Sequence, residues 1–171
     1  VDRNGKEYPD KEAVVDAESR LTWAEVSQKS DKLALGLRDL GFNRGDVLLM
    51  QLPNCVEIYL VVVAGEKAGI TVVTAQPTFR HQEIGALLKH TEAKGIVVIR
   101  SFRDFSYYDM LMELRPQLPK LEHIIIIGKD VPEGTIAFND ILTKKLRKKY
   151  PKDYILKNKF KPYEITRVVT T

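Results

Sequence analysis

The chain has 171 residues, of which 44% are hydrophobic and 29% are charged, and its formal net charge is +4. These values are ordinary for one compact domain, and they exclude a membrane-spanning helix, because the longest apolar run, Ile58 to Ala64, falls far short of the roughly 20 residues required. A single cysteine, Cys55, excludes an internal disulfide and indicates a reducing, cytoplasmic environment.

The first predicted helix spans residues 22–40. Thr22 and Glu25 have the spacing of a capping box, in which each side chain satisfies an unpaired amide at the start of a helix. Gly41 follows at the position where a left-handed residue ends a helix. Between these signals, the residues that recur at helical spacing are Val26, Leu33, Leu37 and Leu40.

A buried strand and a second helix come next. Residues 46–52 are mostly apolar without helical periodicity, which is typical of a strand buried on both faces. Asn54 and Glu57 form a second cap pair, and the residues from Ile58 to Ala64 are apolar nearly all round. We therefore expect a helix that begins after Asn54, is covered by neighbours and ends at Gly69.

The rest of the chain repeats this alternation. Strands are predicted at residues 70–74, 96–99, 124–127 and 166–171. One helix is predicted near residues 82–91. A second is marked by Phe105, Tyr108, Leu111 and Met112, and a last one by Phe138, Ile141, Leu142 and Leu146. Parallel neighbouring strands need a long crossover connection, usually a helix, between them, and the predicted helices supply such connections. The pattern therefore predicts an α/β fold: a Rossmann-like, three-layer, doubly wound, mostly parallel sheet with helices on both faces.

The positive charge is concentrated near the end of the chain. Nine of the 27 basic residues lie between Lys144 and Lys161, where Asp153 is the only acidic residue. Clustered cations could bind nucleic acid or an anionic membrane. Most charge runs of this kind are solvated surface, however, and this one is interrupted by Pro151. We therefore expect a basic connector over residues 144–164 and no nucleic-acid partner.

The usual motifs of catalysis are absent from the sequence. There is no glycine-rich dinucleotide turn, no Walker-type phosphate loop, no histidine and cysteine cluster at metal-ligand spacing, and no nucleophile elbow. His90 and His123 are isolated, Cys55 has no histidine nearby in sequence, and the spacing of Trp23 favours packing. We therefore expect no metal site and no ligand contact at these four residues.

Five motif fragments in the right order resemble one family. They are Leu21-Thr-Trp-Ala-Glu-Val26, Ala34-Leu-Gly-Leu-Arg-Asp-Leu-Gly41, Arg44-Gly-Asp46, Gln51-Leu-Pro-Asn54 together with Glu57, and Glu66-Lys-Ala-Gly-Ile-Thr-Val-Val-Thr74. From about Glu12 onward the chain is thereby similar to the N-terminal part of the adenylate-forming enzymes, which include acyl- and aryl-CoA synthetases, peptide adenylation domains and luciferases. Thr74 stands where that family usually has proline.

The resemblance implies an ATP-dependent carboxylate ligase that uses Mg and passes the acyl group of a carboxylic acid to CoA or to a carrier protein. In that family a Ser-Gly-Thr-Thr-Gly-x-Pro-Lys loop, which holds the ATP phosphates, follows a strand similar to residues 165–171. Neither this loop nor the later catalytic motifs occur in the sequence. We therefore expect a fragment that is inactive alone and has no catalytic residue. Its parts are an N-terminal subdomain (1–143), the connector (144–164) and the strand before the loop (165–171).

The segment Ala75-Gln-Pro-Thr-Phe-Arg-His-Gln-Glu-Ile84 resembles its counterpart in aryl-acid ligases such as dihydroxybenzoate-AMP ligase. The residues that coincide are Pro77, Arg80, Glu83 and Ile84. Arg80 and His81 follow a predicted strand, where a cation could meet a CoA phosphate or the rim of an acyl channel. The alternative is that Arg80 is a surface cation and His81 a first-turn residue of the next helix. These two are the candidate cofactor-binding residues.

A second interpretation of the whole chain remains open. It could be a self-standing Rossmann-like binding or regulatory module whose basic segment, residues 144–161, holds an anionic partner. The ligase interpretation instead predicts that the sheet packs against a sister subdomain. Apolar surface is then exposed on this chain, which favours association, including a homo-oligomer.

Overall fold

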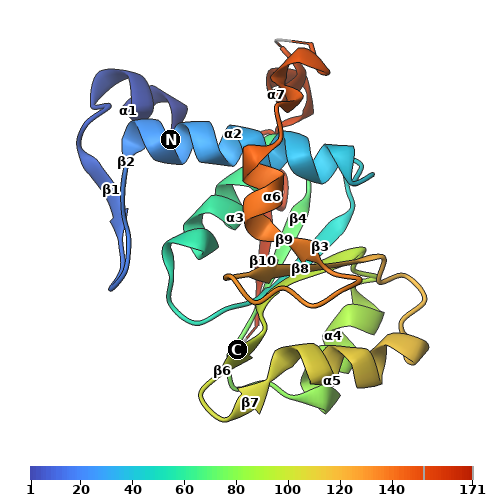
Figure 1. Ribbon diagram of the computed structural model, residues 1–171. Coiled ribbons are helices and arrows are strands. Elements are labelled where there is room, and N and C mark those ends of the chain that lie inside the picture. The colour runs from blue at the N-terminus through green and yellow to red at the C-terminus, as the bar shows by residue number, and fades with distance from the viewer. Residues whose placement is uncertain (152, 171) are drawn as a thin grey trace.

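The computed structural model describes residues 1–151 and 153–170 and has a six-stranded parallel sheet at its centre (Figure 1). The strand order is β10-β4-β3-β5-β8-β9, and every neighbouring pair is parallel. The strands are β3 (Val47–Gln51), β4 (Thr71–Ala75), β5 (Gly95–Ile99), β8 (His123–Ile127), β9 (Ile136–Ala137) and β10 (Arg167–Val169). The predicted doubly wound sheet is confirmed.

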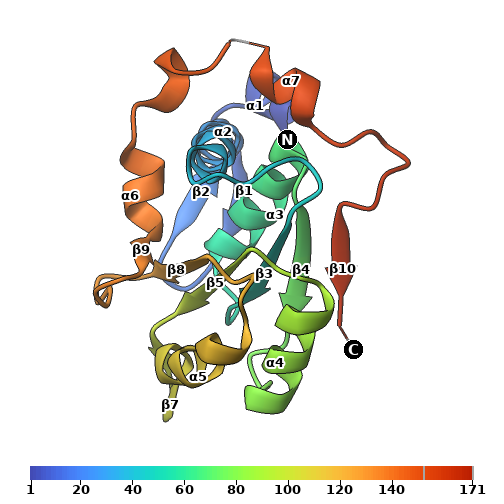
Figure 2. The ribbon, with the colours of Figure 1, turned by 90° about the vertical axis from the view of Figure 1, so that its right-hand side faces the viewer.

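Helices cover both faces of the sheet (Figure 2). One face carries α2 (Trp23–Asp39), α3 (Val56–Ala68) and α6 (Phe138–Thr143), with the short α7 (Tyr154–Asn158) against α2 and α3; the other carries α4 (His81–His90) and α5 (Tyr107–Leu114). Successive side chains of a strand point to opposite faces. Leu48 and Met50 therefore lie in the core beneath α2 and α3, whereas Leu49 lies in the core beneath α4 and α5.

An N-terminal helix and two antiparallel hairpins add to the elements expected from the sequence. The helix is α1 (Asp2–Glu7), and the hairpins pair β1 (Glu12–Val15) with β2 (Arg20–Thr22) and β6 (Ser101–Phe102) with β7 (Phe105–Ser106). Lys67, only 6% exposed, attaches α1 to the rest of the molecule. Its Nζ lies 2.6 Å from Oδ1 of Asp2 and 2.7 Å from Oδ1 of Asp31, so one buried cation joins α1, α2 and α3.

Two predicted helix boundaries are confirmed in detail. Thr22 Oγ1 accepts a hydrogen bond from the Glu25 amide at 3.3 Å, and Glu25 Oε2 accepts one from the Thr22 amide at 2.8 Å, which is the reciprocal pair of a capping box. Gly69 ends α3 with a φ of +72°, a left-handed conformation that glycine adopts without steric cost.

The predicted cap pair at the start of α3 is wrong. The N-cap is Cys55 rather than Asn54, and its side chain makes no capping hydrogen bond. The amide of Val56 instead donates to Asp16 Oδ2 at 2.8 Å, so a carboxylate from the β1–β2 turn caps the helix. Hydrogen bonds from the amides of Glu18 and then Val56 hold the pKa of Asp16 below its usual value, because they stabilise the charged form.

Two later helices are shorter than predicted. Phe105 pairs with Phe102 in the β6–β7 hairpin, and α5 begins only at Tyr107. α6 ends at Thr143, and Leu146 begins a separate 3₁₀ turn, Leu146–Lys148. A second 3₁₀ turn, Arg115–Gln117, continues α5. Apolar spacing alone therefore overestimated the length of both helices. Phe105 pairs in a hairpin, and Leu146 follows a change of backbone direction after α6.

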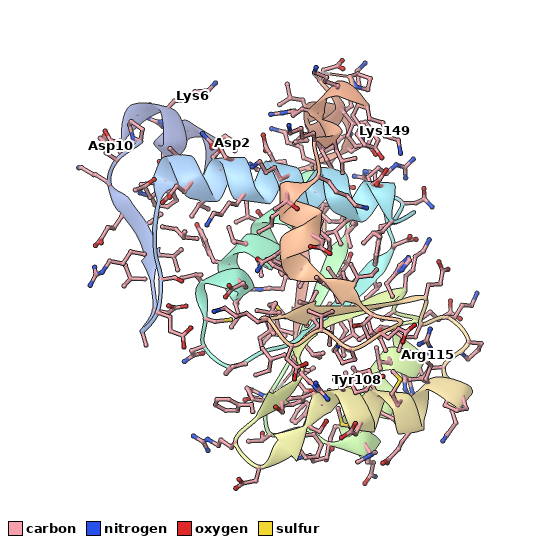
Figure 3. The ribbon with its side chains drawn as sticks, viewed as in Figure 1. Asp2, Lys6, Asp10, Tyr108, Arg115 and Lys149 are labelled. Carbon is pink, nitrogen blue, oxygen red and sulfur yellow. The ribbon has the colours of Figure 1, made fainter. Side chains whose placement is uncertain are left out.

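The basic segment lies against the second half of α2. Lys144 and Lys149 both pair with Asp39, and Arg147 Nη2 lies 2.6 Å from Oδ2 of Asp31. Lys149 stands beside the end of α2 in Figure 3. The hydrogen bond from Lys149, assisted by the one from Lys144, lowers the pKa of Asp39 in spite of partial burial. Ion pairs with α2 thus position part of the connector.

Candidate functional site

The candidate site lies at the carboxyl ends of β3, β4 and β5. The chain leaves β3 toward α3 on one face of the sheet, whereas it leaves β4 and β5 toward α4 and α5 on the other. In doubly wound sheets this divergence creates the crevice in which ligands bind. The connection from β4 to α4, residues Gln76 to Arg80, lies here and is called the β4–α4 loop.

Gln51, the last residue of β3, fixes this loop through hydrogen bonds from its side chain. Its side chain is fully buried at 0% exposure, and Nε2 donates to the carbonyl oxygens of Gln76 and Phe79, both at 2.9 Å. Oε1 is buried and has no hydrogen-bond partner within the described part of the chain. A buried unpaired acceptor destabilises a fold, so the residue carries a cost that apolar packing would avoid.

Tyr107, the first residue of α5, holds the same loop from the neighbouring element. Its ring is buried, and its hydroxyl donates to the carbonyl oxygen of Pro77 at 2.8 Å. The start of α5 is itself fixed, because Ser106 Oγ accepts a hydrogen bond from the amide of Asp109 at 3.2 Å. The tyrosine hydroxyl is therefore placed by a capped helix end.

Arg80 closes the loop, and its guanidinium is half-buried. Nη1 donates to the carbonyl oxygens of Pro77 and Phe79 at 2.8 and 2.9 Å, and the guanidinium carbon lies 4.0 Å from the centre of the Phe105 ring. Within residues 1–151 and 153–170, all hydrogen bonds that the guanidinium group donates come from Nη1. Nε and Nη2 form the other edge of the planar fork, which suits a phosphate or carboxylate bound through two parallel hydrogen bonds.

His81 stands beside Arg80 on the same aromatic ring. Its imidazole meets Phe105 edge to face, with ring centres 6.5 Å apart, and its Nε2 lies 2.8 Å from Oε2 of Glu113 on α5. Its side chain is 47% exposed. The structure therefore brings the two predicted residues together around Phe105, with the arginine partly enclosed and the histidine open to solvent.

The sequence patterns missed Gln51, Phe105 and Tyr107 as parts of this site. One signal was present: Gln51 is a polar residue at the carboxyl end of an otherwise apolar strand. The two aromatic residues gave no such signal, because aromatic side chains at a hairpin and a helix start usually belong to the core. Their role depends on contacts with the β4–α4 loop, which only the folded structure brings next to them.

The other residues noted in the sequence, His90, His123 and Cys55, make contacts of an ordinary structural kind. His90 Nδ1 lies 2.9 Å from the carbonyl oxygen of Ala86, and the ring of His123 packs on Phe42 at 5.5 Å between centres. Burial, with the neighbouring Glu57, raises the pKa of the Cys55 thiol to about 11, which disfavours the reactive thiolate. Within the described residues there is no group of side chains arranged to hold a metal ion, and no helix is long and apolar enough to cross a membrane.

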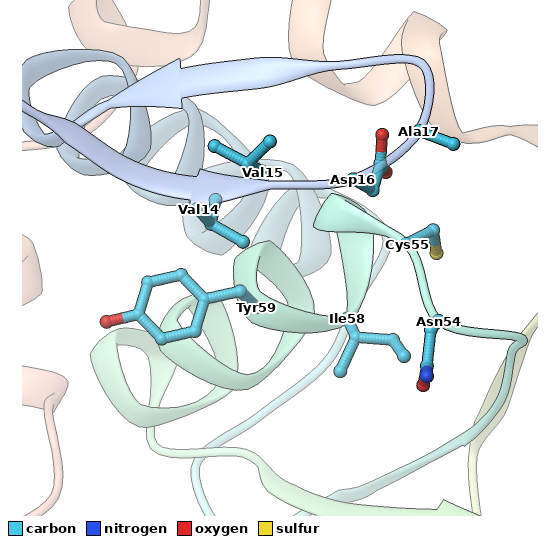
Figure 4. Close-up of a pocket in the computed structure, with 8 residues that line it drawn as sticks. All are labelled: Val14, Val15, Asp16, Ala17, Asn54, Cys55, Ile58 and Tyr59. Atoms are coloured by element: carbon cyan, nitrogen blue, oxygen red, sulfur yellow. The ribbon is translucent and has the colours of Figure 1, made fainter.

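A surface pocket of about 420 Å³ lies elsewhere, between the β1–β2 hairpin and the start of α3 (Figure 4). Two of its polar groups are poorly suited to a ligand, because the Asp16 carboxylate already caps α3 and the raised pKa of the Cys55 thiol favours its protonated form. The Asn54 side chain also lines the pocket. The remaining lining is mainly apolar, and Val14, Ile58 and Tyr59 supply much of it. This pocket offers a ligand little directional chemistry, so the β4–α4 loop is the stronger candidate.

Comparisons with known proteins agree with this architecture. A family model described as AMP-binding enzyme matches residues 1–157. A salicylyl-CoA synthase / salicylate adenylyltransferase of a Streptomyces species is 36% identical over 76% of this chain and 23% of its own length. A mitochondrial medium-chain acyl-CoA ligase of Mus musculus is 31% identical over 83% of this chain and 25% of its own. An anthranilate CoA ligase crystallised with anthranoyl-AMP matches with a TM-score of 0.77 at 23% identity, over 82% of this chain and 26% of that one.

The extent of these matches matters for their interpretation. The chain spans about a quarter of the length of the curated relatives it matches. The structural match at 23% identity concerns the fold, whereas the family model covers most of the chain. On the strength of that coverage, the chain belongs to the AMP-binding enzyme family and corresponds to an N-terminal portion of the AMP-binding domain.

Proposed function

We propose that the protein carrying this chain is an ATP-dependent ligase that converts a carboxylic acid into its acyl-adenylate, releases pyrophosphate, and transfers the acyl group to CoA or a carrier thiol. The observation that carries the proposal is the family match over residues 1–157. In this proposal residues 1–143 form the N-terminal subdomain, residues 144–164 connect it to the strand at residues 165–171, and the protein is cytoplasmic.

The residues of this chain fit the possible cofactors unequally. The sequence has no glycine-rich phosphate loop of the kind that holds ATP in this family, and no group of side chains among the described residues is arranged to hold Mg. The described residues do fit a phosphate of CoA: the Nε–Nη2 edge of Arg80 is available, and the Phe105 ring supports the guanidinium from one side. CoA supplies the acyl-accepting thiol, and Arg80 and His81 would orient its phosphate-bearing part.

The proposed substrate is an aryl acid. This follows from the similarity of residues 75–84 to aryl-acid ligases and from the 36% identity with a salicylate-activating relative. A relative at 31% identity is a medium-chain acyl-CoA ligase, so an aliphatic acid is the competing substrate class. The acid must therefore be identified by assay rather than by relationship.

The test of the proposed reaction is pyrophosphate release by the full-length protein with ATP and a panel of aryl and aliphatic acids. We expect release to depend on the added acid and to be fastest with an aryl acid. Preference for an aliphatic acid would overturn the substrate assignment alone. No release with any acid, from a folded protein, would overturn the proposed function.

The proposed role of Arg80 has its own test. Arg80→Lys keeps the positive charge but loses the two-pronged geometry, and we expect KM for CoA to rise about tenfold or more. Arg115→Ala is the matched control, because this exposed arginine lies at the far end of α5 (Figure 3). Equal KM values for CoA in Arg80→Lys and wild type would show that Arg80 is an ordinary surface cation.

The self-standing module with an anionic partner is the weaker proposal. Lys144, Lys149 and Arg147 pair with carboxylates of α2, which reduces the positive field that such a partner would meet. Tight, salt-sensitive binding of an RNA or DNA oligonucleotide to the full-length protein, together with no acid-dependent pyrophosphate release, would favour it.

A further inference from the structure

The carbonyl oxygens of the β4–α4 loop connect three side chains that come from different parts of the fold. The carbonyl of Phe79 accepts from Gln51 Nε2 and from Arg80 Nη1, both at 2.9 Å. The carbonyl of Pro77 accepts from Tyr107 Oη and from Arg80 Nη1, both at 2.8 Å. Each carbonyl thus joins one buried donor to the same nitrogen of the same guanidinium.

This arrangement determines the orientation of the arginine. Both hydrogens of Nη1 are used by the two carbonyls, and the guanidinium carbon lies over the Phe105 ring, 4.0 Å from its centre. A planar group with one nitrogen fully hydrogen-bonded and an aromatic ring against it has little freedom to rotate. The Nε–Nη2 edge is then held in one direction before any ligand arrives, which lowers the ordering cost of binding.

Gln51 has a feature that a purely structural residue in this place would lack. Its Oε1 is buried without a partner in the described residues, although an apolar side chain of similar volume would fill the same space. The amide could not be reversed without loss, because Nε2 serves two carbonyl acceptors. The two donated hydrogen bonds therefore account for a glutamine, rather than an apolar residue, at position 51.

We propose that Gln51 and Tyr107 are positioning residues for Arg80: acting through the carbonyls of Phe79 and Pro77, they hold its guanidinium with the Nε–Nη2 edge directed at a phosphate of the acyl-accepting thiol. This inference rests on the proposed ligase function for its kinetic consequence. Its structural content, an ordered β4–α4 loop, is independent of that function.

Conservative variants separate positioning from stability. Gln51→Met removes both donated hydrogen bonds and also the unpaired acceptor, and each loop carbonyl keeps another partner: Gln76 O accepts from the Phe79 amide at 3.1 Å, and Phe79 O keeps Arg80. Tyr107→Phe removes only the hydroxyl. Tyr108→Phe is the matched control on the next residue of α5, outside the loop contacts (Figure 3).

The experiment measures the full-length protein in two ways. We expect KM for CoA to rise about five- to tenfold in Gln51→Met and Tyr107→Phe, with kcat reduced less than about twofold, since one or two hydrogen bonds of ordinary strength are lost. Amide hydrogen exchange of Gln76, Thr78, Phe79 and Arg80, the loop residues that carry an amide hydrogen, should accelerate by a similar factor in both variants. Tyr108→Phe should match wild type in both measurements.

Three outcomes decide the matter. An unchanged KM for CoA in both variants would overturn the proposal, and so would a fall in kcat with KM unchanged, which is the signature of fewer folded molecules. If the wild-type protein forms no adenylate, the proposed function fails instead, and the exchange data alone decide whether Gln51 and Tyr107 order the loop. Unchanged exchange in both variants would then refute the positioning role.

Discussion

Asp16 lies in the turn of the β1–β2 hairpin, yet its carboxylate caps α3, a helix that begins 40 residues later. Oδ1 accepts hydrogen bonds from the amides of Glu18 and Ser19 at 2.8 and 2.7 Å, and Oδ2 accepts one from Val56 at 2.8 Å. One side chain therefore closes the turn and fastens the hairpin to the helix. The negative charge at the helix N-terminus is also favourable for the helix dipole.

We predict that Asp16→Ala lowers the melting temperature by about 2–4 °C at pH 7, because the start of α3 and the hairpin turn both lose their acceptor. The pKa of Asp16 is lower in the folded protein than its usual 3.8, so its contribution is present at neutral pH and is lost as the pH falls through the lowered pKa. Thermal unfolding of wild type and variant across this range should show the difference shrinking with acidification.

Asp10→Ala is the matched control, since this exposed carboxylate belongs to the segment before β1 (Figure 3). It should leave the melting temperature close to that of wild type. An equal loss in both variants, or a loss in Asp16→Ala that does not change with pH, would contradict the capping role.

The sequence predicted that Arg80 and His81 follow a strand, and they do follow β4, but it did not reveal which contacts hold the β4–α4 loop. Arg80 and His81 were singled out because they follow a strand, and the structure places both around Phe105. Whether they bind CoA stays a prediction. Gln51 and Tyr107 could not be assigned from local patterns, because their partners are backbone carbonyls 25 to 30 residues away in sequence.

Among the elements, α2 and α6 approach each other unusually closely at Gly36. A Cβ atom added to this glycine would overlap with Cγ2 of Ile141 on α6. Glycine is a poor helix former, so its replacement by alanine in mid-helix would ordinarily gain about 1 kcal/mol. Overpacking of a close contact costs about 1–3 kcal/mol, and here it has the larger effect.

We therefore predict that Gly36→Ala reduces the free energy of unfolding by up to about 2 kcal/mol, measured by urea denaturation. Gly85→Ala in α4 is the control, because its added Cβ would meet only the flexible end of Leu114 at 3.2 Å, and it should be neutral or stabilising. The pair Gly36→Ala with Ile141→Ala should cost less than the sum of the single changes. Additive losses would show that the two positions are not in contact.

Elements were predictable where the signal and the structure are both local. Thr22 and Glu25 cap α2 as expected, and Gly69 ends α3. The prediction failed at Phe105, whose pairing with Phe102 overrides its apolar spacing with α5. The basic segment also contains α7 and forms ion pairs with α2, and no local pattern in the sequence predicts these contacts.

At the scale of the whole molecule, the sheet is well covered except at one edge. The inner strands are buried on both faces, whereas all three residues of β10 are exposed. Val168 and Val169 point to opposite faces and are 43% and 59% exposed, and Ile165, just before the strand, is 71% exposed. Within the described residues β10 pairs only with β4, so its outer edge is available to another strand.

We predict that a polypeptide of residues 1–171 self-associates through this edge at micromolar concentration, because apolar side chains and unpaired backbone groups coincide there. Val169→Lys places a charge on the strand and should reduce association in sedimentation experiments, with an unchanged circular dichroism spectrum. Val15→Lys is the control, since Val15 is 44% exposed on the distant β1–β2 hairpin and should not affect association. A monomeric wild-type polypeptide, or equal association in both variants, would show that β10 is not the contact.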